Sequence, residues 1–351
     1  MDCDMTGYDR LELKPDYEET KRRWEAFWSG DIIDRPIIRV WVPLENRKTN
    51  KDGYYERLNA NIDVYVAGIV ENAPGLLYMG ESLPQPGMSF GCDEVAACCG
   101  GDLYFNESSP NTCWGKPFVD DWESAMPLSL KEDNPYWLRK RTLLDKCAEA
   151  MRGKMLFRPF DLLTNLDLLM GMRGSERLCM DLIECPDVIE QVLEQAFDIF
   201  EELHERAYKK YGLPGPDGLD HLQCDFSCMI SGAMFDRFAL PYLEREAEVF
   251  GKRVFYHWDG PGALKHAASL IASKNIYVLG FVPGIGNGKH KDYLDIYQKA
   301  QNVGKAIWVG GTADEIKYLH KSLKPHMTVY DVWAESEDDA NRLLEWFVKN
   351  T

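Results

Sequence analysis

The alternation of short apolar segments with amphipathic ones, from Tyr136 to the end of the chain, most strongly limits what this chain can fold into. Apolar runs rich in β-branched and aromatic residues predict strands at 155–160, 221–226, 253–258, 277–282, 306–309 and 328–333. Helical spacing predicts helices at 136–152, 175–183, 186–211, 231–250, 262–272, 291–302, 313–323 and 337–349. Repeated strand–helix units build a parallel sheet. So many in succession favour a closed (β/α)8 barrel of the TIM type, with an open doubly wound sheet as the alternative.

The first 150 residues follow a less regular pattern. A helix is predicted at 16–28 and a buried strand at 35–42, and 74–134 is rich in Gly, Pro, Asn and aromatic residues. We expect this stretch to form short strands and ordered loops that cap one end of the core. The sequence thus predicts one domain over 1–351. Residues 1–150 form an N-terminal helical and loop-rich extension with the first barrel elements, and residues 151–351 form the regular units.

Charge and cysteine content exclude several classes of protein. The chain has 57 acidic and 40 basic residues, a net charge of −17, which disfavours nucleic acid and acidic membrane surfaces as partners. The ten cysteines include no CxxC pair and fit reduced thiols. No apolar run approaches 18 residues, and Met1–Asp4 lacks the charged-then-apolar pattern of an export signal. We therefore expect a cytoplasmic protein with no membrane segment.

Polar residues at strand ends are the candidates for an active site, because barrel active sites lie where strands end. His257 and Asp259 end one predicted strand just before a Gly-Pro-Gly turn. An imidazole and a carboxylate two residues apart could supply two ligands to zinc, with the third from His221, Asp225, Asp236 or Asp331. The alternative is that His257 and Asp259 form a metal-free acid/base or structural pair.

Asp225 ends the preceding strand and could act as a general acid or base beside His221 or His257; alternatively it caps the turn. Asp161 could line the pocket or cap a helix, and Trp258 and Trp308 are pocket candidates by position alone. The Gly-rich segment 284–289 lacks the spacing of a nucleotide-binding loop and predicts a flexible loop near the mouth. The aromatic residues Trp114, Trp122, Tyr136 and Trp137 favour core packing over a pocket for a flat ligand.

Several ordered blocks carry a family resemblance. They are Phe160–Leu163, Met172–Glu176, Asp181–Asp187, Asp225–Ser227, Met234–Phe235, Leu240–Leu243 and Tyr256–Gly260. In this order they resemble the uroporphyrinogen decarboxylase-like superfamily, most closely between Met155 and Gly284. The resemblance implies a TIM-type barrel with its active site around 256–260.

The superfamily holds two kinds of enzyme. Its decarboxylases carry an N-terminal arginine-rich motif, which this chain lacks. Its methyltransferases move a methyl group between a corrinoid and a small molecule, usually with zinc bound through a His-x-Cys motif. Here His257 and Asp259 stand at those positions, and the last strand has no cysteine. The resemblance therefore implies a corrinoid-linked methyltransferase that takes a methyl group from a small methoxylated or methylamine-type donor.

In this hypothesis His257 and Asp259 hold zinc or polarise the donor, and Asp225 handles the proton. Asp161, His221, Trp258 and Trp308 bind the substrate, and a separate corrinoid protein docks over the mouth. Two alternatives remain. One is a metal-free decarboxylase or lyase that acts on a small acid, and the other is a non-catalytic barrel that binds a ligand.

Overall fold

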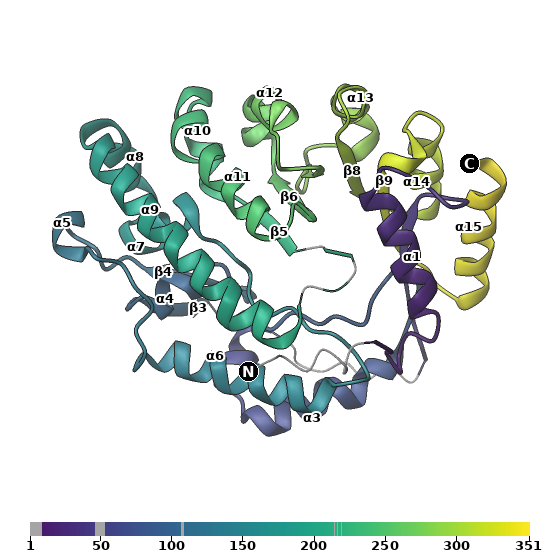
Figure 1. The fold of residues 1–351 in the computed structure, drawn as a ribbon, viewed down its shortest axis with the longest axis horizontal. Helices are drawn as coiled ribbons and strands as arrows, with labels where there is room; N and C mark the ends of the chain where they lie inside the picture. The colour runs from purple at the N-terminus through teal and green to yellow at the C-terminus, as the bar shows by residue number, and fades with distance from the viewer. Residues whose placement is uncertain (1–8, 46–52, 107–108, 214, 216, 219) are drawn as a thin grey trace.

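The computed structural model describes residues 9–45, 53–106, 109–213, 215, 217–218 and 220–351, and shows a mixed α/β fold (Figure 1). The strands are β1 (Ile37–Pro43), β2 (Leu76–Gly80), β3 (Asp102–Asn106), β4 (Ser109–Lys116), β5 (Asp220–Gln223), β6 (Val254–Asp259), β7 (Val278–Val282), β8 (Ala306–Gly310) and β9 (Thr328–Trp333). The α-helices are α1 (Tyr17–Trp28), α2 (Tyr54–Asn59), α3 (Ile62–Asn72), α4 (Glu94–Cys98), α5 (Trp122–Ala125), α6 (Pro135–Met151), α7 (Asn165–Arg173), α8 (Ser175–Glu184), α9 (Pro186–Leu203), α10 (Gly232–Phe238), α11 (Leu240–Val249), α12 (Ala267–Ala272), α13 (Leu294–Asn302), α14 (Ala313–His320) and α15 (Glu337–Asn350).

The main sheet has seven strands in the order β2-β1-β9-β8-β7-β6-β5. All neighbouring strands from β1 to β5 are parallel, and β2 joins the edge antiparallel to β1. In Figure 1 the helices α12 to α15 lie outside an arc of strands, as right-handed βα crossovers require. The carboxyl ends of β1 and of β5 to β9 therefore lie together on one side of the sheet, called here its carboxyl edge.

The sheet is open between β2 and β5 over the residues that the structure describes, so closure into a barrel is not confirmed. The predicted strand at 155–160 was wrong: this segment is extended but forms only an isolated bridge between Arg158 and Gly87. Pro159 explains the interruption, because proline has no N–H to donate to a ladder. The other predicted strands are confirmed, with ends that differ by a few residues.

Proline also divides a predicted helix. The segment 231–250 forms two helices, α10 and α11, which meet at Ala239. Pro241 stands in the first turn of α11, where its missing N–H is tolerated, whereas inside a longer helix it would break a hydrogen bond. The helix α7 was not predicted. It begins at Asn165 with positive φ and is buried on nearly all sides, so it lacks a polar stripe.

Helix α1 packs against the amino end of the strands. Its Trp24 and Phe27 belong to a small core cluster with apolar side chains from five strands: Ile37, Phe255, Val278, Ala306 and Val329. A larger cluster fills the layer between sheet and helices and includes the buried Trp122 and Trp137. The small cluster forms the floor beneath the carboxyl edge of the sheet.

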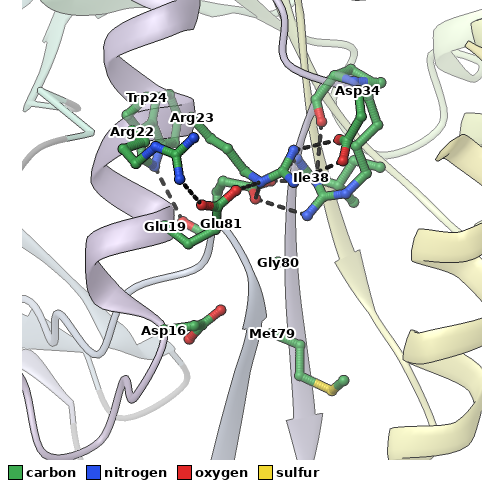
Figure 2. A network of polar contacts seen from close by, with 12 residues as sticks. Asp16, Glu19, Arg22, Arg23, Trp24, Asp34, Ile38, Met79, Gly80 and Glu81 are labelled. Carbon is green, nitrogen blue, oxygen red and sulfur yellow. Dashed lines mark hydrogen bonds and ion pairs between the residues drawn. The ribbon is translucent and has the colours of Figure 1, made fainter.

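A buried ion pair between Arg35 and Glu81 fixes the amino end of β1; Figure 2 shows Glu81 beside Ile38. Glu81, which follows β2, accepts hydrogen bonds from both terminal nitrogens of Arg35 at 2.6 and 2.8 Å. The same carboxylate accepts from the N–H of Ile38 at 2.9 Å and lies 3.5 Å from Nε of Arg23 on α1. This network joins α1, the amino end of β1 and the carboxyl end of β2, opposite the carboxyl ends of the parallel strands.

Among the described residues, no helix has both the length and the apolar character needed to cross a bilayer. The predicted lack of an export signal concerns Met1–Asp4, which lie outside the described residues.

Candidate active site

A cavity of about 590 Å³ opens at the carboxyl edge of β5 to β9. Its polar lining comes from Cys92, Arg158, Asp161, His221, Gln223, Asp225, His257, His290 and Asp331. Its apolar lining includes Phe255, Phe281 and Trp308. The size and the mixed lining are typical of pockets that bind small molecules. The structure therefore brings together Asp161, His221, Asp225, His257, Trp308 and Asp331, which the sequence singled out.

Asp161 and His221 are in direct side-chain contact at the open side of the sheet. Nε2 of His221, on β5, contacts Oδ1 of Asp161, which lies on the extended segment after Pro159. Burial opposes ionisation of Asp161, but His221 and the nearby Arg158 outweigh it and lower the pKa of Asp161 to about 2. Asp161 is therefore a carboxylate at neutral pH and holds the His221 ring in the cavity.

Asp225 lies in the opposite electrostatic environment. Its backbone N–H and that of Phe226 donate to the buried carboxylate of Asp167 at 2.9 and 2.8 Å, which fixes the turn after β5. Its own Oδ1 is buried without a hydrogen-bond partner among the described residues. Burial first, and then the charges of Asp259 and Asp161, raise the pKa of Asp225 to about 6.

His257 stands between these groups. The period of two along β6 turns Phe255 and His257 toward the cavity. Burial, with a smaller effect from the neighbouring His221, lowers the pKa of His257, so its ring is neutral at pH 7. The ring centroids of His221 and His257 are 6.1 Å apart. Asp259 is half exposed at the end of β6, with Oδ1 4.0 Å from Nε2 of His257, and does not line the cavity.

Phe255 and Trp308 form an aromatic wall of the cavity, and Arg39 packs against Trp308. Arg39 donates to both oxygens of Asp331 at 2.7 and 2.8 Å, and its guanidinium lies 4.7 Å from the ring centroid of Trp308. Phe255 meets Trp308 edge to face at 3.9 Å between centroids. These contacts fix the Trp308 ring, because edge-to-face and cation–π geometries are both directional.

Besides Asp259, two more predicted residues lie outside the cavity lining. Trp258 points away from the cavity: it is buried in the core, and its Nε1 donates to the carbonyl of Ala263 at 2.9 Å. It is next to His257 on the strand, so the pleat turns it to the other face. Asp236 is exposed on α10, where its charge acts on His266, and it does not reach the cavity.

The predicted zinc ligands are not arranged around a common point in the cavity. Over the described residues, no three His, Cys, Asp or Glu side chains are placed to hold a metal ion. A structural or catalytic zinc site needs at least three such protein ligands. Zinc binding therefore stays a prediction.

The sequence reasoning missed Cys92, Arg158, Gln223, Phe255 and His290. Phe255 could have been found, because it precedes His257 by two residues on the same strand. His290 directly follows the Gly-rich segment that was expected near the mouth, and its Nδ1 lies 2.7 Å from the hydroxyl of Tyr297. Cys92 and Arg158 lie on irregular segments, for which periodicity gives no signal.

Comparisons with known proteins give a likeness of fold. No protein-family model matches the chain, and no curated protein matches it. Among solved structures, the chain is similar to a methyltransferase from Methanosarcina mazei, with a TM-score of 0.59. The match covers 94% of this chain and 98% of that chain at 11% sequence identity. An identity this low shows a shared fold alone, since one fold carries many activities. The resemblance to the uroporphyrinogen decarboxylase-like superfamily is not confirmed by a family match.

Proposed function

We propose that this chain is a methyltransferase: a small methylated donor binds in the cavity, and a corrinoid on a partner protein accepts the methyl group. The observation that carries the proposal is Asp225, a cavity carboxyl whose pKa of about 6 suits proton donation near neutral pH. The full-length likeness of fold to a methyltransferase supports the same reaction class.

The reaction needs a proton at the atom that loses the methyl group. The acceptor's electron pair forms the new bond to the methyl carbon, and the carbon–oxygen or carbon–nitrogen bond of the donor breaks. Its electron pair stays on the oxygen or nitrogen, which takes the proton from the carboxyl of Asp225. At pH 7 about one molecule in ten carries that proton, given a pKa of about 6.

The neighbouring residues orient the donor. The neutral ring of His257 can hydrogen-bond to the donor's oxygen or nitrogen, and Trp308 supplies a flat apolar contact. The Asp161–His221 pair fixes the opposite side of the cavity. A cavity of about 590 Å³ holds a small molecule but not a whole corrinoid, so the acceptor would meet the donor at the mouth.

The test uses purified protein with cob(I)alamin and three donor classes: methanol, methylamines and methoxylated benzoates. Methylcobalamin formation is followed by absorbance, with and without a chelator. We expect turnover with one class, and the chelator shows whether that turnover depends on a metal ion. Asp225→Asn should lower kcat about 10²- to 10⁴-fold, the contribution of a general acid. Lack of methyl transfer from every donor would refute the proposal.

A carboxy-lyase is a second candidate, because Arg158 lines the cavity and an arginine suits a substrate carboxylate. The same variants separate the two functions when small carboxylic acids are added and released CO₂ is measured. Release of CO₂ that depends on Asp225, without methyl transfer, would favour the lyase. Ligand binding without either reaction would favour a non-catalytic barrel.

A further inference from the structure

The backbone ladder on the open side of the sheet stops where the cavity begins. The N–H groups of Leu156 and Arg158 donate to the carbonyls of Pro84 and Pro86, both at 2.9 Å. The N–H of Met88 in turn donates to the carbonyl of Arg158 at 2.8 Å, the last backbone–backbone bond of this series among the described residues. The backbone groups beyond it are buried, so they need other partners.

Glu94 on α4 and Lys140 on α6 supply those partners. Both side chains are fully buried, and Nζ of Lys140 lies 2.6 Å from Oε2 of Glu94. Four backbone groups, two on each extended segment, bond to this pair: the carbonyls of Met88 and Pro159 to Nζ at 2.6 and 3.1 Å, and the N–H groups of Phe90 and Asp161 to Oε2 and Oε1 at 2.9 and 3.1 Å.

Side-chain hydrogen bonds from this pair thus replace the backbone hydrogen bonds of a strand ladder. Burial raises the pKa of Glu94 and lowers the pKa of Lys140, and their mutual contact opposes both shifts. The ring centroids of Phe90 and Phe160 lie 4.0 and 4.4 Å from Nζ and exclude water from it. An isolated buried pair adds little to stability compared with apolar packing, so its location beside the cavity suggests another role.

We infer that Glu94 and Lys140 are positioning residues: they fix the backbone at Asp161 so that its carboxylate meets His221 in the cavity. One oxygen of Glu94 binds the N–H of Asp161 itself, so a shift of Glu94 moves the carboxylate. Only the kinetic consequence of this inference rests on the proposed function.

The test is the double variant Glu94→Gln/Lys140→Met, which removes both charges and nearly conserves volume. The new amide can accept one of the two N–H groups but not both. By ¹³C NMR of the carboxyl groups, we expect the pKa of Asp161 to rise from about 2 toward 3.8. The low-field ring N–H signal of His221 should disappear. If the methyl-transfer assay succeeds, kcat should fall about 10- to 100-fold with KM within about twofold.

The matched control is Arg35→Met/Glu81→Gln. This pair is also buried and doubly hydrogen-bonded, but it lies at the amino end of β1 (Figure 2). We expect the control to lower stability while the Asp161 titration, the His221 signal and kcat stay as in the unmodified protein.

A folded double variant with an unchanged Asp161 titration and His221 signal overturns the inference, whatever reaction the cavity supports. If the double variant does not fold, Glu94→Asp keeps the charge and withdraws the carboxylate by one methylene. An unchanged Asp161 titration in that variant overturns the inference equally. If both NMR signals change but the unmodified protein transfers no methyl group, the positioning role stands and the proposed function fails.

Discussion

Replacing Asp225 by Asn should stabilise the protein at neutral pH while removing its proposed activity. The pKa of Asp225 is about 6 in the folded chain, against 3.8 for an ordinary aspartate. The folded state therefore binds the proton more tightly than the unfolded state. The stabilisation that Asp225 contributes to the folded state is fully present below pH 3.8 and is lost as the pH rises through 6. The difference of about 2.2 pKa units corresponds to about 3 kcal/mol at 1.36 kcal/mol per unit.

Because Asn cannot ionise, the stability of the variant does not fall as the pH rises through 6. Its side chain breaks no existing bond at Oδ1, which has no partner among the described residues. Asp225 is partly exposed, and screening by water reduces the gain, so we expect about 2 kcal/mol at pH 8 and less than about 1 kcal/mol at pH 4. Urea unfolding at both pH values measures this.

Asp236→Asn is the matched control, because Asp236 is exposed on α10; we expect its stability to equal that of the unmodified protein at both pH values. An Asp225→Asn variant that is no more stable at pH 8 would refute the electrostatic account of this carboxyl. So would a gain of equal size at pH 4, since Asp225 is mostly protonated there.

Three further predictions concern Glu246, Asp161 and the two tryptophans Trp308 and Trp258. Burial raises the pKa of Glu246 to about 8, above its ordinary 4.5, so stability is lost as the pH rises between these values; Glu246→Gln should gain stability at pH 9 relative to pH 5 in urea unfolding. The pKa of Asp161 is lowered to about 2, so its stabilisation is present above pH 3.8 and lost toward pH 2. Asp161→Asn should lower stability by about 2 kcal/mol at pH 7, and by less as a pH series approaches 2. Trp308→Ala should raise the donor's KM about tenfold, whereas Trp258→Phe should leave KM unchanged and lower stability by about 1–3 kcal/mol through the lost bond to Ala263.

Strand periodicity predicted much of the site because it predicted the strands. The strand prediction at 253–258 and the rule that sites form at strand ends were sufficient to find His257, and the same reasoning found Asp225. The rule does not extend to the adjacent residue. Trp258 directly follows His257, and because side chains alternate along a strand, it points to the opposite face of the sheet. Whether a residue faces the cavity therefore depends less on its closeness to His257 in sequence than on whether it is an even or odd number of residues away along the strand.

The open side of the sheet could not be predicted in this way. The segment 155–160 has the apolar composition of a strand, yet the carbonyl of Pro159 bonds to a side chain of α6, and the N–H of Asp161, just after the segment, bonds to a side chain of α4. Glu94 and Lys140 are 46 positions apart by their residue numbers, and neither belongs to a motif. Contacts between side chains and backbone at that separation depend on the tertiary fold, which local patterns do not encode.

Two of the cavity carboxyls, Asp161 and Asp225, show why the chemistry also required the fold. Asp161 and Asp225 lie in one cavity, and burial acts on both in the same direction. Their pKa values diverge, to about 2 and about 6, because His221 contacts Asp161 directly, whereas Asp225 is left among other carboxylates. Environments that push two titratable groups apart assign one to hold charge and the other to exchange a proton. The division of roles between Asp161 and Asp225 therefore depends on the irregular segment after Pro159, which brings Asp161 into contact with His221.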